Sequence, residues 1–109
     1  MSEFKVEITK AGEGPNCPVG AKVTAHYHGM LTNGKVFDSS VNRGKPFQFT
    51  CGVGQVIKAW DLGFQQLNKG AKATLTCPPS YAYGNQSVGG GLIPANSTLI
   101  FEVELIDFK

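Results

Sequence analysis

The chain has 109 residues, of which 41% are hydrophobic, and its 10 Lys and Arg against 8 Asp and Glu give a formal net charge of +2. This length supports one hydrophobic core, so we expect a single domain over residues 1–109. The weak charge argues against nucleic acid or an anionic membrane as a partner, and no apolar run reaches the roughly 20 residues that span a bilayer. Residues 1–6 carry charges where a signal peptide needs apolar residues, so we expect a cytoplasmic monomer.

Three cysteines, Cys17, Cys51 and Cys77, are far apart in the sequence and form no C-x-x-C pair. Their odd number, without a histidine nearby at ligand spacing, argues against a disulfide framework and against a zinc site. Cys51 and Cys77 each close an alternating apolar series. We therefore interpret these two as small buried hydrophobic residues.

Alternating apolar and polar residues predict short strands along most of the chain, because successive side chains of a strand point to opposite faces. The strands expected from this pattern cover residues 4–9, 23–28, 47–51, 71–77 and about 98–108. In the first strand, Phe4, Val6 and Ile8 form the face expected to be buried. Glycine and proline at residues 12–15 are expected to end it.

Asn33 and Gly34 stand between the apolar pairs at residues 30–31 and 36–37. A type I′ turn needs positive φ at both of its central residues, and Asn-Gly tolerates this better than other pairs. The segment therefore predicts a β-hairpin closed by a two-residue type I′ turn.

One segment has helical spacing, with apolar residues at Ile57, Trp60, Phe64 and Leu67. Steps of three and four place these side chains on one stripe of a helix over residues 56–67, which Gly70 would end. A helix of about 12 residues is marginal alone in water, so it needs a sheet to pack against. The expected fold is α+β, with a mostly antiparallel sheet covering one short amphipathic helix.

The sequence contains no nucleophile elbow, Walker loop or H-E-x-x-H zinc motif. His26 and His28 share one face of a predicted strand; a metal-binding pair is conceivable, but solvent-facing strand histidines are the more common case. Seven aromatic residues lie at segment ends and turns: Tyr27, Phe37, Phe47, Trp60, Tyr81, Tyr83 and Phe101. They fit an aromatic-lined cavity, although periodicity alone favours simple filling of the core.

Five motifs together resemble the FKBP-type peptidyl-prolyl isomerases, in order and in approximate spacing. They are residues 27–31 (YHGML), 33–40 (NGKVFDSS), 56–60 (VIKAW), 81–84 (YAYG) and 93–94 (IP). The resemblance covers essentially the whole chain. It implies an antiparallel β-sheet half-wrapped around one short α-helix, and catalysed rotation about the peptide bond before proline without cofactor or metal.

The resemblance also assigns roles to individual residues. Trp60 resembles the indole at the floor of the family's pocket, and Asp38 the carboxylate at its edge, with Arg43 as counter-ion. The residues implied to be catalytic are Asp38, Trp60, Tyr83 and Phe101. Those implied to bind substrate or drug are Tyr27, Phe37, Asp38, Arg43, Phe47, Gln55, Val56, Ile57, Trp60, Tyr83, Leu92, Ile93 and Phe101. For Asp38 and Arg43 the alternative is an exposed surface ion pair worth under about 1 kcal/mol.

Two features depart from the family's pattern. The loop over residues 84–94 is one residue longer and contains three successive glycines at 89–91, with Val88 near a position where His-Pro is common. Ala59 also replaces a frequent glycine before Trp60. These changes leave the pocket floor intact and bear on substrate preference and on any protein that docks on the loop.

The resemblance implies proline-containing peptides and proteins as substrates, and inhibition by macrolides of the rapamycin and tacrolimus type. It also raises a drug-dependent complex with a phosphatase or kinase. A different interpretation is a binding module that captures proline-containing segments of partner proteins, with catalysis incidental. A carrier of small hydrophobic ligands is a third, and it predicts binding of apolar dyes without any dependence on proline.

Overall fold

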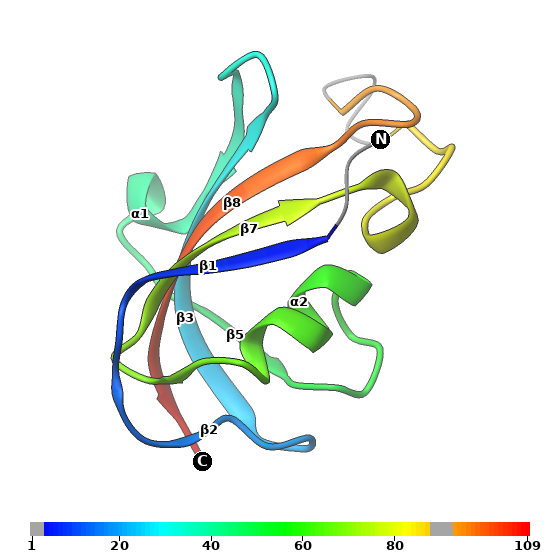
Figure 1. Ribbon diagram of the computed structural model, residues 1–109. Helices are drawn as coiled ribbons and strands as arrows, with labels where there is room; N and C mark the ends of the chain where they lie inside the picture. The colour runs from blue at the N-terminus through cyan, green and yellow to red at the C-terminus, as the bar shows by residue number, and fades with distance from the viewer. Residues whose placement is uncertain (1–3, 88–92) are drawn as a thin grey trace.

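The computed structural model describes residues 4–87 and 93–109. Its main feature is a six-stranded sheet that curves over one helix (Figure 1). The strand order is β1-β7-β8-β3-β4, with β5 also paired to β3. The strands are β1 (Lys5–Lys10), β3 (Lys22–Leu31), β4 (Val36–Ser39), β5 (Phe47–Thr50), β7 (Lys72–Cys77) and β8 (Leu99–Phe108). All of these pairings are antiparallel, which confirms the predicted α+β class.

The remaining elements are short. They are α1 (Ser40–Arg43), α2 (Lys58–Phe64), a 3-10 helix η1 (Pro79–Tyr81), and a two-stranded sheet of β2 (Glu13–Asn16) and β6 (Asn68–Lys69). Helix α2 lies under the curved face of the six-stranded sheet (Figure 1). None of the described helices is long and apolar enough to cross a membrane.

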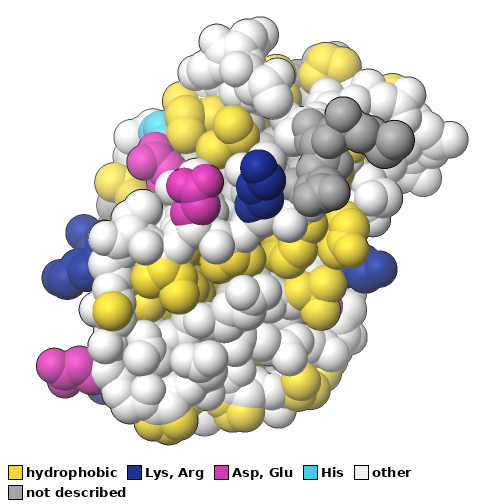
Figure 2. All heavy atoms as spheres, viewed as in Figure 1, with side chains coloured by type: hydrophobic (Ala, Val, Ile, Leu, Met, Phe, Trp, Pro, Cys, Tyr) yellow, Lys and Arg dark blue, Asp and Glu magenta, His cyan; other side chains and the backbone are white. Residues whose placement is uncertain are grey.

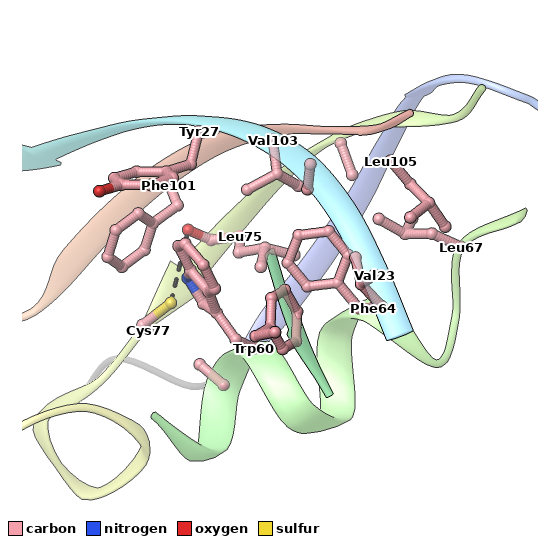
Figure 3. Close-up of a cluster of buried hydrophobic side chains, with 14 of the residues drawn as sticks. Val23, Tyr27, Trp60, Phe64, Leu67, Leu75, Cys77, Phe101, Val103 and Leu105 are labelled. Atoms are coloured by element: carbon pink, nitrogen blue, oxygen red, sulfur yellow. Dashed lines mark hydrogen bonds between the residues drawn. The ribbon is translucent and has the colours of Figure 1, made fainter. Parts of the chain in front are cut away.

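The core lies between α2 and the sheet (Figure 3). Strands β3, β7 and β8 each bury every second side chain, as the alternation predicts. From the helix, Trp60 and Phe64 point into this layer, and both are buried. The helix therefore depends on the sheet for its stability, because only tertiary packing stabilises so short a helix.

Helix α2 is shorter than the predicted 56–67 range. Ile57 takes the N-cap position, where its side chain caps nothing, and the helix ends at Phe64. Leu67 is nevertheless fully buried. The apolar spacing therefore identified the buried residues correctly but predicted too long a helix. Gly63 lies close to the sheet: a Cβ added there would be 3.1 Å from the Leu75 methyl groups.

One other prediction of local structure was wrong, and two short elements were missed. Ile8 was predicted to be buried but is 52% exposed, and the register of β1 against β7 shifts directly after it. The segment at residues 12–15 does not only end a strand, since Glu13–Asn16 forms β2 and pairs with β6. Ser40–Arg43 forms an unpredicted helix, in which the Ser39 side chain accepts a hydrogen bond from the Asn42 amide.

The predicted hairpin is present, but its turn differs. Gly34 donates to the Leu31 carbonyl at 2.9 Å, and Leu31 donates to the Lys35 carbonyl at 2.9 Å. Gly34 has φ of 88°, whereas Asn33 is not among the residues with positive φ. This is the three-residue loop in which a left-handed glycine follows a type I turn, so the type I′ prediction was wrong. Asn33 contributes instead through its side chain, which accepts from the Lys35 amide at 2.9 Å.

The three cysteines are free and buried. Cys51 and Cys77 have no exposed surface, which confirms their interpretation as small buried residues. Burial raises the pKa of both thiols to about 12. They therefore stay protonated and unreactive at neutral pH.

Candidate active site

Trp60 is the residue around which the site is built. Its indole rises from α2 toward the sheet, where Tyr27 on β3 and Phe101 on β8 meet it (Figure 3). The ring centroids lie 4.9 Å from Tyr27 and 5.2 Å from Phe101. Both pairs meet edge to face, which is a favoured arrangement of aromatic rings. The indole nitrogen is buried and finds no hydrogen-bond partner among the described residues.

Two further rings complete the aromatic wall. Phe47 on β5 lies 5.8 Å from the Trp60 ring, and Phe37 on β4 lies 5.5 Å from Phe101. Strands β4 and β5 both pair with β3, at residues 28–30 and at residues 22–25. Residues distant in sequence thus meet on one side of the indole.

These rings enclose an open cavity of about 490 Å³. A volume of this size is typical of a small-molecule or peptide-side-chain site. Hydrophobic side chains also form a band across the middle of the face drawn in Figure 2. Ten residues line the cavity: Tyr27, Phe37, Asp38, Phe47, Gln55, Val56, Ile57, Trp60, Tyr83 and Phe101. All ten are among the residues that the sequence resemblance assigned to the pocket.

Two assigned residues do not line the cavity, and a third lies outside the described residues. Arg43 stands behind its edge and reaches Tyr27 and Asp38. Ile93 is 5% exposed and packs in the hydrophobic core. Leu92 lies outside the described residues, as do Val88 and the three glycines of the loop at 84–94.

Gly29 is a residue of the site that sequence reasoning missed. It lies on β3, two residues after Tyr27, and a Cβ added there would be 2.7 Å from the Phe37 ring and 2.8 Å from the Phe101 ring. Glycine inside a strand commonly marks a place where another group approaches the backbone closely. Here two wall rings occupy the space of the missing side chain. The signal available in the sequence was a glycine inside the strand formed by the YHGML motif.

A polar cluster lies at one edge of the cavity. The Tyr27 hydroxyl donates to Asp38 Oδ2 at 2.5 Å, and the Arg43 guanidinium donates to Asp38 and, at 2.9 Å, to the Tyr27 oxygen. The Ser39 amide donates to Asp38 Oδ1 at 2.9 Å. The Asp38 and Arg43 side chains remain 43% and 51% exposed. The carboxylate is therefore held in place by three donors while it still faces solvent and the cavity.

These contacts set the protonation states of the cluster. Burial acts to raise the pKa of Asp38, but the hydrogen bond from Tyr27 and the guanidinium of Arg43 outweigh it and hold that pKa below its usual 3.8. Burial, followed by the hydrogen bond to Asp38, raises the pKa of Tyr27. Burial and then the charge of Asp38 raise the pKa of Tyr83. At neutral pH the site thus holds a carboxylate and two phenol groups that can donate hydrogen bonds.

We expect the value of kcat/KM for a proline peptide to be constant from about pH 5 to pH 8, because Asp38 stays ionised throughout this range. The lowered pKa has a second consequence. The stability contributed by ionised Asp38 is complete above its ordinary pKa and is lost as the pH falls through the lower folded-state value. A pH profile of activity measures the first effect. A half-loss near about pH 6 that Asp38→Asn abolishes would contradict it.

The loop between β5 and α2 forms the opposite rim. It brings Gln55, Val56 and Ile57 to the cavity. The Ile57 amide donates to no acceptor within residues 4–87 and 93–109. Its carbonyl accepts from the Trp60 amide at 2.9 Å, which fixes this residue directly over the first turn of α2. The rim can therefore offer one main-chain donor beside the apolar floor.

The two strand histidines lie on the other face of the sheet. His26 Nδ1 is 2.9 Å from Ser40 Oγ, and His28 Nδ1 is 2.9 Å from Ser39 Oγ. Both rings are half-buried, so they are less exposed than the sequence predicts. No group of three or more His, Cys, Asp or Glu residues suited to a metal ion exists in the part of the chain that the structure describes.

Comparison with known proteins gives a consistent result. The model of the FKBP-type peptidyl-prolyl cis-trans isomerase family matches residues 14–106. The chain is 52% identical to FK506-binding protein 1 of Dictyostelium discoideum, covering 96% of this chain and 97% of that protein. It is 54% identical to FK506-binding protein 4 of Mycosarcoma maydis over 99% of its own length, but spans only 28% of that protein.

Among solved structures, the crystal structure of AtFKBP13 is similar with a TM-score of 0.90 and 44% sequence identity. The similarity covers 97% of this chain and 93% of that one. The half-wrapped sheet and single main helix expected from the five motifs are thus confirmed by fold as well as by sequence. The chain belongs to the family of FKBP-type peptidyl-prolyl cis-trans isomerases, enzymes that rotate the peptide bond preceding proline.

Proposed function

We propose that the cavity over Trp60 is the site at which this chain binds and isomerises X-Pro peptide bonds. The observation that carries this proposal is the open cavity formed by ten residues, with an indole as its floor and aromatic rings as its wall. A proline ring is compact and apolar, and such a cavity suits it. The residues that we assign to binding are these ten together with Arg43, which holds Asp38.

The reaction requires no nucleophile. The peptide bond has partial double-bond character, with a rotational barrier of about 18–20 kcal/mol. Its planar, charge-separated form is favoured by water, so removing water from the amide weakens the resonance that resists rotation. A cavity that binds the twisted amide better than either planar isomer lowers the barrier, and each tenfold gain in rate needs about 1.4 kcal/mol of this preference. The apolar wall around Trp60 supplies such an environment.

The polar groups at the edges orient the substrate. Ile57 and Tyr83 both line the cavity, and we assign to the Ile57 amide and the Tyr83 hydroxyl the role of donors to carbonyl groups that flank the proline. Asp38 is a poor proton acceptor at neutral pH because its pKa is lowered. Its role is therefore electrostatic, through its charge and its hydrogen bonds to Tyr27 and Arg43.

We further propose that FK506 and rapamycin-type macrolides occupy the same cavity and compete with proline peptides. The names of the relatives, FK506-binding proteins, support this. A drug-dependent complex with a phosphatase or kinase would use the cavity rim and the loop at residues 84–94. That loop departs from the family pattern, so we expect partner selection to be the property in which this chain differs most from its relatives.

The test is a protease-coupled assay on an X-Pro peptide with the Asp38→Asn variant. Hydrogen bonds to a charged group contribute about 1.5–3 kcal/mol and neutral ones about 0.5–1.5, so we expect kcat/KM to fall about tenfold. FK506 should inhibit the unmodified chain competitively. Asp107→Asn, which removes a carboxylate near the end of β8, is the matched control and should retain full activity.

Unchanged activity in Asp38→Asn would count against the assigned role of this residue. Capture of a partner protein in a pull-down that survives in a catalytically inactive variant would favour the binding-module interpretation, in which capture rather than catalysis is the function. Inhibition by FK506 that is not competitive with peptide would separate the macrolide site from the substrate site.

A further inference from the structure

The loop that leads from β5 to α2 carries the Val56 and Ile57 rim of the cavity. It contains no helix or strand over residues 51–57. Gly52 and Gly54 both have left-handed φ, at 78° and 80°, a conformation that glycine adopts without strain. A loop of this kind needs specific hydrogen bonds if it is to keep one conformation.

Asp61, in the first turn of α2, supplies these bonds. Its Oδ1 accepts from the Gly52 amide at 2.9 Å, and its Oδ2 accepts from the Gly54 amide at 3.0 Å. Both oxygens of one carboxylate are thus directed at the loop. Hydrogen bonds to a charged acceptor are roughly twice as strong as neutral ones. Asp61 follows Trp60 directly, so the same helical turn holds the cavity floor and the loop that forms its rim.

Two glutamine side chains reinforce the arrangement. Gln55 accepts from the Thr50 amide at 2.9 Å through Oε1, which ties the middle of the loop to the end of β5. Gln65 donates to the Asp61 carbonyl at 2.6 Å through Nε2. Asp61 therefore ties the first half of the loop, at Gly52 and Gly54, to helix α2, and Gln55 ties the middle of the loop to the end of β5.

We propose that Asp61 is a positioning residue for the isomerase: its carboxylate holds the Val56–Ile57 rim in the conformation that binds substrate. The proposal rests on the proposed function of the cavity. Asp61 is not among the lining residues, so it acts through the loop and not on the substrate. Asp61 was not identified from the sequence, because the glycines at 52 and 54 do not reveal which side chain their amides bind.

The proposal predicts a particular kinetic pattern. When only a fraction of molecules has the binding-competent rim, the apparent dissociation constant rises in inverse proportion to that fraction. Bound substrate still lies in the same apolar cavity over Trp60, so turnover of the bound complex is unchanged. KM should therefore rise while kcat stays constant, and the dissociation constant for FK506 should rise by the same factor as KM.

The experiment uses Asp61→Asn, which keeps the shape of the side chain but loses the charge and one acceptor. We expect KM for an X-Pro peptide to rise about tenfold, with kcat within about twofold. Amide hydrogen exchange at Gly52 and Gly54 should accelerate, because both amides lose a charged acceptor. Asp61→Glu restores the carboxylate and should return KM most of the way. Asp107→Asn, whose carboxylate accepts from the Phe108 amide, should change none of these values.

Gly54→Ala disturbs the same loop without touching Asp61. An added Cβ meets no atom within 4 Å, but the left-handed φ is unfavourable for alanine. Gly54→Ala should therefore also raise KM. It tests the proposal even where Asp61→Asn fails to fold. An unchanged KM in both variants, or a fall in kcat at constant KM, would overturn the proposal. Normal turnover in Trp60→Leu would instead overturn the assignment of the cavity.

Discussion

Replacing Trp60 with leucine is expected to lower kcat/KM for an X-Pro peptide by at least about tenfold, the loss of about 1.4 kcal/mol of transition-state stabilisation. The indole is the floor of the cavity and packs against five other rings, those of Tyr27, Phe47, Phe49, Phe64 and Phe101. Leucine leaves the site wider and wetter, which strengthens the amide resonance that catalysis must weaken. Protease-coupled kinetics measure the loss of kcat/KM, and denaturant unfolding measures the accompanying loss of stability.

Phe64→Leu is the matched control for this variant. Phe64 lies one turn further along α2, packs 5.6 Å from the Trp60 ring and is fully buried, but it does not line the cavity. Both substitutions should reduce the free energy of unfolding by about 1–3 kcal/mol. Only Trp60→Leu should lose activity. Equal losses of kcat/KM in the two variants would mean that general loosening of the core, and not the cavity floor, limits catalysis.

Gly29→Ala is expected to have a comparable effect through a single methyl group. The added Cβ would lie 2.7 Å from Phe37 and 2.8 Å from Phe101, so both wall rings must move by several tenths of an ångström. Overpacking of this kind costs about 1–3 kcal/mol of stability. Misplacement of binding groups by about 1 Å can reduce catalysis about a hundredfold, and we expect kcat/KM to fall between about tenfold and a hundredfold.

The control for Gly29→Ala is the same change at Gly63. That glycine lies in α2 and does not line the cavity, and the Leu75 methyl groups that an added Cβ would meet at 3.1 Å need to shift by only a few tenths of an ångström. Alanine is favoured over glycine in a helix by about 1 kcal/mol, so stability should change little and activity not at all. If Gly29→Ala retains normal kcat/KM, the positions of Phe37 and Phe101 do not matter for the reaction.

The strands could be predicted from sequence where one face is buried. Burial forces alternation, and β3 and β7 alternate along their whole length, as does β8 up to Ile106. The prediction failed where burial ends: Ile8 continues the apolar alternation of β1 but is 52% exposed. The predicted helix ends were also wrong. Ile57 and Leu67 are apolar because they contact the cavity and the core, and neither lies in the helix.

Short elements were beyond reach of periodicity. Helix α1 is a single turn that depends on the Ser39 cap and on Gly44 with φ of 69° at its end, and one turn has no repeating pattern. The β2–β6 pair depends on residues more than 50 positions apart meeting in space. The turn at Asn33 was assigned to the wrong type because the Asn-Gly pair fits both a two-residue loop and the three-residue loop that is found.

Composition and spacing alone favoured core filling over a cavity, and the individual pocket residues came from the resemblance of five motifs to a family. The structure brings ten of those residues around one cavity. The structure adds two residues to the site. Gly29 leaves space for two wall rings, and Asp61 binds two amides of the loop that forms the rim. Both roles depend on tertiary contacts. No local sequence pattern predicts them.

The most direct measurement of the central claim is the fluorescence of Trp60, the single tryptophan of the chain. Titration with FK506, and separately with an X-Pro peptide, should change the emission in a saturable way at one ligand per chain, because each ligand covers the indole floor. The peptide should lose its effect when FK506 is already bound. Inhibition of the isomerase by FK506 without any change in Trp60 emission would place the ligand elsewhere and contradict the account.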